Sequence, residues 1–134
     1  MVAHIKDSGL QFHPRKGDIL ICDFEGNIVP EIVKKRPVVV IRNQLPYRGE
    51  LVFVVPLSST PPEHDIPYSF KLSKNYLSND NEAMYAKCDL VCSVSLARLD
   101  RIKMGYRQYG TPKMLPEDFN RVVAGVKYAL GFAS

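Results

Sequence analysis

The chain has 134 residues, enough for one domain, and its 46% hydrophobic and 24% charged residues favour a packed core over disorder. No apolar run approaches the roughly 20 residues of a membrane-spanning helix, and Met1 to Lys16 lack the apolar segment of a signal peptide. We therefore expect a cytoplasmic protein with no membrane partner. The formal net charge of +4 permits a nucleic-acid partner without requiring one.

The first half of the chain predicts three strands. Asp18–Phe24 carries apolar residues on both faces, Pro37–Ile41 is a continuous β-branched run, and Leu51–Leu57 is a third apolar run. Glycine, asparagine and proline interrupt residues 25–35 and 43–50, so these segments are expected to form a loop and a turn.

The second half of the chain predicts further short strands. Tyr68–Leu72 alternates as a fourth strand, and the polar, asparagine-rich segment 73–82 that follows is expected to be a loop. Ala83–Lys87 and Leu90–Leu96 then indicate either one bent strand or two short ones.

The end of the chain changes from a strand period to a helix period. Pro116 suits the first helical position and Gly131 suits the residue after the last turn, so both bounds of a C-terminal amphipathic helix are predicted. Several short strands followed by one helix predict a mainly β domain, a small barrel or strongly curved antiparallel sheet with the helix packed on it. The helix places one apolar face at the spacing i, i+3, i+4, i+7 and i+11: Phe119, Val122, Val123, Val126 and Leu130.

Three cysteines do not form a metal-binding or disulfide pattern. Cys22, Cys88 and Cys92 include no C-x-x-C spacing, and their odd number argues against a disulfide framework. We expect them to be small buried side chains, with Cys88 and Cys92 on the same face of one strand because they are four residues apart. The sequence thus predicts no bound metal and no cofactor.

The chain contains four ordered segments with recognisable motifs: KGDILICDF, PEIVKKRPVVVI, VVPLSST and AKCDLVCSVSLARLDRI. Together they resemble the PemK/MazF family of type II toxins. KGDILICDF at Lys16–Phe24 is similar to the family's Gly-Asp opening, and PEIVKKRPVVVI at Pro30–Ile41 is similar to its acidic loop followed by an Arg-Pro strand. VVPLSST at Val54–Thr60 resembles the strand that ends in two hydroxyl residues. AKCDLVCSVSLARLDRI at Ala86–Ile102 contains a Leu-Asp pair that resembles the family's Ile-Asp element.

The resemblance implies a fold and an activity. The implied fold is an SH3-like β-barrel with a C-terminal helix in residues 16–134, preceded by an N-terminal tail at 1–15, and the implied assembly is a homodimer. The implied activity is that of an mRNA interferase, a metal-independent endoribonuclease that cuts single-stranded RNA into 2′,3′-cyclic phosphate and 5′-hydroxyl ends and so inhibits growth. The implied protein partner is a cognate antitoxin.

The implied reaction needs no nucleophile from the enzyme, because the 2′-hydroxyl of the RNA attacks the phosphate. The protein must orient the phosphate, stabilise its added negative charge and move two protons. Arg36, at the expected junction of loop and strand, matches the family's functional arginine, and a guanidinium suits charge stabilisation. Ser58 matches the hydroxyl residue that closes the third strand, and Ser59 is the alternative.

Two acidic residues are candidates for the general base. Asp89 belongs to a Lys-Cys-Asp sequence that some family members use, but aligning the chain through the Leu-Asp pair at 99–100 places Val94 there instead. Glu31 is an alternative base or an RNA-contacting residue. Asp89 is retained as the catalytic candidate.

Other basic residues are candidates for RNA binding. Lys34 and Lys35 precede Arg36, and Arg98 and Arg101 begin a basic and aromatic stretch that suits phosphates and stacked bases, or alternatively a solvated connection to the helix. His64, in a proline-rich loop, is interpreted as a solvated residue.

The sequence leaves two rival functions open. A CcdB-like toxin of the same fold type binds DNA gyrase without catalysis, and an inactive barrel could simply bind nucleic acid. Arg36 and Ser58 favour the nuclease, as does the absence of tryptophan from the chain, since the gyrase-binding branch relies on a C-terminal tryptophan.

Overall fold

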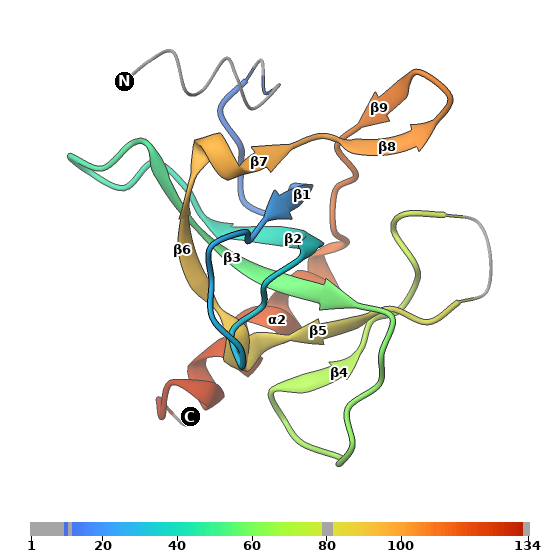
Figure 1. The fold of residues 1–134 in the computed structure, drawn as a ribbon. Coiled ribbons are helices and arrows are strands. Elements are labelled where there is room, and N and C mark those ends of the chain that lie inside the picture. The colour runs from blue at the N-terminus through green and yellow to red at the C-terminus, as the bar shows by residue number, and fades with distance from the viewer. Residues whose placement is uncertain (1–9, 11, 79–81, 133–134) are drawn as a thin grey trace.

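A computed structural model of the chain describes residues 10, 12–78 and 82–132 (Figure 1). The fold is mainly antiparallel β with one C-terminal helix, α2 (Pro116–Ala129). Strands β1 to β5 and β7 form one path in the order β4-β5-β3-β2-β1-β7, and β6 pairs with β3. The six strands of this path have the following bounds: β1 Ile19–Asp23, β2 Lys35–Arg42, β3 Leu51–Ser58, β4 Ser69–Lys71, β5 Tyr85–Lys87 and β7 Leu99–Asp100.

The mainly β architecture with a C-terminal helix confirms the expectation from sequence, and several bounds differ. The segment from 83 to 96 forms two short strands, β5 and β6 (Cys92–Ser95), separated by the 3-10 helix η1 (Cys88–Leu90). A second 3-10 helix, η2 (Leu96–Arg98), leads into β7. Within the described part of the chain, no strand pairing joins β4 to β7 and closes the sheet.

A separate two-stranded hairpin was not predicted. It consists of β8 (Ile102–Gly105) and β9 (Gln108–Gly110), and it extends away from the main sheet (Figure 1). Its residues are mostly exposed on both faces, so the sequence carries no alternation of apolar and polar side chains there.

The main sheet separates two apolar clusters. Alternate residues of a strand point to opposite faces, so Val39 packs on the side of α2 with Val122 and Val126, while Val38 and Val40 pack on the other side. The second cluster also receives Leu10, which precedes the expected start of the domain. The boundary between an N-terminal tail and the domain, expected between residues 15 and 16, stays a prediction.

The expectation that Cys88 and Cys92 share a strand face is wrong. The turn of η1 interrupts the period of two, and Cys88 packs in the cluster under α2 while Cys92 packs against the opposite cluster. Helix and η1 approach closely because Gly125 has no side chain. A Cβ atom there would lie 2.7 Å from the Cys88 Sγ.

Buried thiol and tyrosine hydroxyl groups make the folded state less stable at alkaline pH. Burial raises the pKa of the Cys22 and Cys88 thiols to about 12, and burial together with the hydrogen bond to Asp118 raises the pKa of the Tyr76 hydroxyl to about 12. In the unfolded chain the same groups have lower pKa values, and the pKa of a thiol there is 9.0. Their contribution to the free energy of unfolding is therefore complete below pH 9 and is lost as the pH rises towards 12.

We predict that the free energy of unfolding falls between pH 9 and pH 11, with each buried thiol adding up to about 1.4 kcal/mol per pH unit to the slope. Urea titrations across this range measure it. Cys22→Ala is the matched variant, because it lacks one titrating thiol and should give a shallower slope than the wild type. Equal slopes for the two proteins would contradict the assignment.

Candidate active site

Arg36 and Ser58 lie beside each other on neighbouring strands. Val38 of β2 pairs with Pro56 of β3, and two more residues along each antiparallel strand bring Arg36 opposite Ser58. Both residues then project from the face that carries Val38 and Val40, which is the face opposite α2. Arg36 is the second residue of β2 rather than a residue before it, since the pairing of Lys35 with Asp23 extends the strand beyond its apolar run.

Strand β5 brings a lysine and an aspartate to the same place. Ser58 pairs with Tyr85, so Lys87, two residues farther on, faces the same side of the sheet, and Asp89 follows in η1. Arg36, Ser58, Lys87 and Asp89 line one pocket of about 440 Å³. The pocket therefore combines two cationic side chains, a hydroxyl and a carboxylate.

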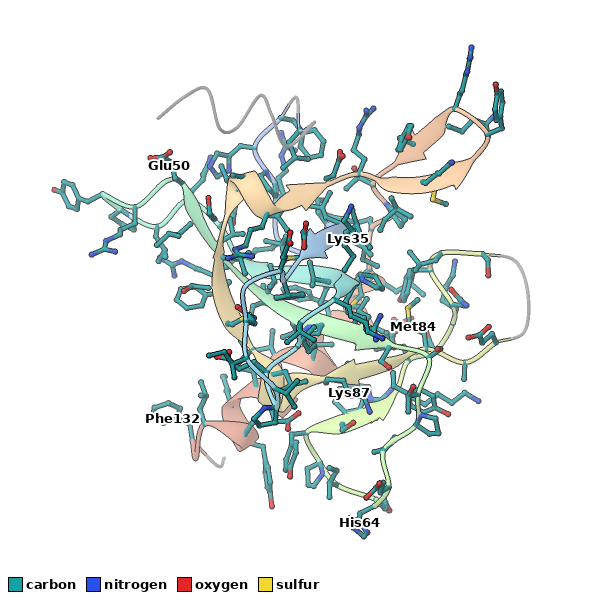
Figure 2. All side chains as sticks on the ribbon, in the orientation of Figure 1. Lys35, Glu50, His64, Met84, Lys87 and Phe132 are labelled. Carbon is teal, nitrogen blue, oxygen red and sulfur yellow. The ribbon has the colours of Figure 1, made fainter. Side chains whose placement is uncertain are left out.

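Two loops and the strand floor supply the walls of this pocket. Ile32 comes from the β1–β2 loop. His64 comes from the β3–β4 loop and lies at the tip of that loop, away from the sheet (Figure 2). The other walls are mostly apolar or hydroxyl-bearing: Pro56, Leu57, Pro62, Glu63, Ile66, Tyr68, Ser69 and Leu90.

A second cavity, of about 360 Å³, adjoins the first. Arg36 and Ser58 line it as well, together with Ser59. The Ser58 Oγ accepts a hydrogen bond from the Thr60 amide at 3.0 Å, which fixes the turn after β3. The remaining lining residues come from the start of β2, the end of β3, the turn after it and the β4–β5 loop: Pro37, Leu57, Thr60, Asn75, Leu77, Ser78, Glu82, Ala83 and Met84. The Arg36–Ser58 pair is thus shared by two neighbouring cavities.

The other candidate residues line neither cavity. Glu31 accepts a hydrogen bond from the Ile28 amide at 2.7 Å, and Arg98 donates to the carbonyl oxygens of Asp23 and Glu25 at 2.8 and 2.9 Å. Glu31 and Arg98 therefore stabilise the β1–β2 loop that precedes Arg36.

Three basic candidates remain outside the cavities. Lys34 and Lys35 are exposed beside Arg36, and Figure 2 labels Lys35 at the first position of β2. The Arg101 guanidinium lies 5.1 Å from the centre of the Tyr109 ring, at the base of the hairpin.

The structure places further residues in the pocket that were not chosen as site residues from the sequence. Lys87 was visible only as part of the Lys-Cys-Asp sequence, and His64, exposed as expected, lines the pocket instead of facing only solvent. Ser69 carries no sequence signal at all, because its place in the pocket depends on the pairing of β4 with β5.

The arrangement suits acid–base chemistry on a phosphate ester. Arg36 and Lys87 offer positive charge to phosphate oxygens, Ser58 offers a hydroxyl, and Asp89 offers a carboxylate that can accept a proton. The described residues contain no cluster of three or more metal-ligating side chains. The described helix is also too short and polar to cross a membrane.

Solved structures share this fold. The chain is 18% identical to the crystal structure of MazF from Deinococcus radiodurans, with a TM-score of 0.65 over 90% of this chain and 99% of that one. It is 17% identical to an endoribonuclease from Mycobacterial species solved in complex with its cognate antitoxin, with a TM-score of 0.60 over 90% of this chain and 98% of that one. The protein thus has a MazF-like fold.

Sequence comparison gives the family. Residues 15–126 match the PemK-like, MazF-like toxins of type II toxin-antitoxin systems, so the chain belongs to this family. It is also 30% identical over 138 residues to the uncharacterised protein YifN of Escherichia coli (strain K12), covering 85% of this chain and 91% of YifN.

Proposed function

We propose that this protein is the toxin of a type II toxin-antitoxin system and acts as a metal-independent endoribonuclease on single-stranded RNA. The observation that carries the proposal is the shared pocket of Arg36, Ser58 and Asp89 on the side of the sheet opposite α2. Membership of the toxin family supports it. The proposed products are a 2′,3′-cyclic phosphate and a 5′-hydroxyl end.

In the proposed reaction, the 2′-oxygen forms a bond to phosphorus and the bond from phosphorus to the 5′-oxygen breaks. Asp89 accepts the proton of the 2′-hydroxyl, and the departing 5′-oxygen takes up a proton from solvent, to which Asp89 later returns its own. Arg36 binds the phosphate oxygens as their negative charge grows, and Ser58 donates a hydrogen bond to one of them. The Lys87 ammonium, on the same side of the sheet, adds to the positive field of the pocket.

RNA on either side of the cut is proposed to contact residues around the pocket. Lys34 and Lys35 are exposed next to Arg36, and Ser59 lines the second cavity. We propose that Glu31, Arg98 and Arg101 lie at the edge of the same RNA-binding surface. Arg98 and Glu31 act there by holding the β1–β2 loop in place.

The metal-independent mechanism predicts that purified protein cuts single-stranded RNA in excess EDTA at the rate seen without EDTA. The proposed charge stabilisation comes from side chains, so chelation removes nothing that the reaction needs. Gel analysis of labelled RNA, with identification of the cyclic phosphate end, measures it. Loss of cleavage in EDTA and its return with magnesium would disprove the mechanism. No cleavage under any condition would favour the gyrase-binding or the inactive nucleic-acid-binding alternative.

We also propose a homodimer, and we predict a particle of twice the 15.1 kDa chain mass at micromolar concentration. Tyr128, Leu130 and Phe132 leave an exposed apolar surface at the end of the chain, which a second subunit can cover. Light scattering at several protein concentrations gives the mass. A single-chain mass at every concentration would contradict the dimer.

The remaining parts of the proposal concern partners and setting. A cognate antitoxin protein is proposed to bind and block the toxin, since the similar mycobacterial endoribonuclease was solved with its own antitoxin. Cytoplasmic action on RNA accords with this role. We further propose that the curved sheet belongs to the SH3-like barrel type.

A further inference from the structure

Ser69 is a buried polar residue inside the candidate pocket. It is 5% exposed, and its Oγ has no hydrogen-bond partner among the described residues. Burying a hydroxyl without a partner opposes folding, so such groups are uncommon in well-packed domains. The backbone of Ser69 pairs with Lys87 across the β4–β5 ladder, which turns both side chains to the pocket side of the sheet.

The end of the pocket near Ser69 is suited to a flat, mostly apolar group. Pro56, Ile66 and Leu90 line it and offer apolar atoms, whereas the ring of Tyr68, which also lines the pocket, stacks on Tyr128 of α2. The pocket volume of about 440 Å³ falls in the range of small-ligand sites. Lys87 provides positive charge at the same end of the pocket, while Ser58 lies on β3 and Arg36 on β2.

We propose that this end of the pocket receives the base of the nucleotide next to the cut phosphate, and that the Ser69 hydroxyl hydrogen-bonds the polar edge of that base. The proposal rests on the endoribonuclease function argued above and makes Ser69 a specificity-determining residue. Rotation about the Ser69 Cα–Cβ bond turns the hydroxyl from its buried position towards the bound base.

The missing partner explains why the hydroxyl favours one base over another. In the free protein, the Ser69 Oγ gains nothing from its present surroundings, so a base that offers a matching donor or acceptor gives the pocket a hydrogen bond without breaking one. A base without that group leaves the hydroxyl unsatisfied. One such hydrogen bond corresponds to a discrimination of about tenfold between bases.

The test measures binding, so it does not depend on whether the protein cuts RNA. The four nucleoside 3′-monophosphates are titrated into wild-type protein, Ser69→Ala and Ser93→Ala, and the dissociation constants are obtained by NMR or calorimetry. Ser93 is exposed on β6 and does not line the pocket, so Ser93→Ala is the matched control. We expect the wild type and Ser93→Ala to prefer one nucleotide about tenfold, and Ser69→Ala to bind all four within about twofold.

Stability measurements exclude a merely structural role. Removing an unpartnered buried hydroxyl should leave the urea midpoint of Ser69→Ala equal to or above that of the wild type. Ser69→Thr, which keeps the hydroxyl, should keep the nucleotide preference. Equal binding of all four nucleotides by the wild type, or an unchanged preference in folded Ser69→Ala, would overturn the inference. A wild type that cuts no RNA but shows the Ser69-dependent preference would retain the subsite and remove only the nuclease function.

Discussion

Replacing Arg36 with alanine is expected to lower single-turnover RNA cleavage by about 10²–10³ while leaving the fold intact. The side chain is exposed at the start of β2, and the one acceptor that its guanidinium reaches among the described residues is the neighbouring Lys35 carbonyl, at 3.3 Å. Its loss should therefore change the free energy of unfolding by no more than about 0.5 kcal/mol. Growth inhibition by the toxin should disappear together with the cleavage.

The reason for the large kinetic effect is the position of Arg36 between the two cavities. Negative charge grows on the phosphate as the 2′-oxygen attacks, and a positioned guanidinium binds two phosphate oxygens at once. Arg36→Lys should recover only part of the rate, because an ammonium group cannot reproduce the planar pair of donors. Ser58→Ala should be milder than Arg36→Ala, since it removes a single uncharged hydrogen bond.

Lys34→Ala is the matched control for charge. Lys34 is exposed two residues before Arg36 but lines neither cavity, so its loss should weaken RNA binding in a salt-dependent way and leave the chemical step nearly unchanged. Single-turnover rates at saturating protein separate the two effects, and circular dichroism checks the fold. Wild-type cleavage by a folded Arg36→Ala protein would refute the catalytic role of Arg36.

The apolar pattern predicts the centre of the fold better than its edges. The runs that became β2 and β3 are recognisable because buried strands need continuous β-branched and apolar residues. Backbone pairing extends β2 over Lys35 and Arg36, where the side chains are exposed and leave no apolar signal. The β8–β9 hairpin escapes prediction for the same reason.

The candidate site is only partly predictable because it depends on strand pairing. Arg36 and Ser58 meet through the register of β2 and β3, which includes an irregularity between Val40 and Arg42 that no sequence pattern indicates. Ser69 and Lys87 are 18 residues apart in sequence and meet only through the β4–β5 ladder. The family resemblance indicated Arg36, Ser58 and Asp89, and the sequence placed His64 in a nearby loop, whereas the places of Lys87 and Ser69 in the pocket follow only from the fold.

Replacing Asp118 with alanine is expected to cause the largest loss of stability, about 2–4 kcal/mol. Asp118 is 1% exposed in the first turn of α2, and its carboxylate accepts hydrogen bonds from three groups of the β4–β5 loop. The Tyr76 hydroxyl donates at 2.6 Å, and the Ser73 hydroxyl and amide donate at 2.7 and 3.1 Å. The Tyr76 oxygen in turn accepts from the Leu115 amide at 3.1 Å, just before the helix.

The size of the effect follows from what alanine leaves behind. The Tyr76 hydroxyl and the Ser73 amide would lose their acceptor, and hydrogen bonds to a charged group contribute more than neutral ones. The carboxylate also lies at the helix N-terminus, where negative charge is favourable. Asp118→Asn keeps one acceptor oxygen and should lose less. Glu117→Ala removes an exposed carboxylate from the same turn and should change stability by less than about 0.5 kcal/mol.

The hydrogen bonds of Asp118 with Tyr76 and Ser73 also connect the helix to the candidate site. The β4–β5 loop that Asp118 holds supplies Asn75, Leu77 and Met84 to the second cavity, beside Arg36 and Ser58. Loosening the loop should therefore weaken RNA binding more than the chemical step. Urea unfolding of Asp118→Ala, Asp118→Asn and Glu117→Ala gives the stability order, and RNA titrations of the folded variants give the affinities. An Asp118→Ala protein as stable as Glu117→Ala would show that these hydrogen bonds do not support the fold.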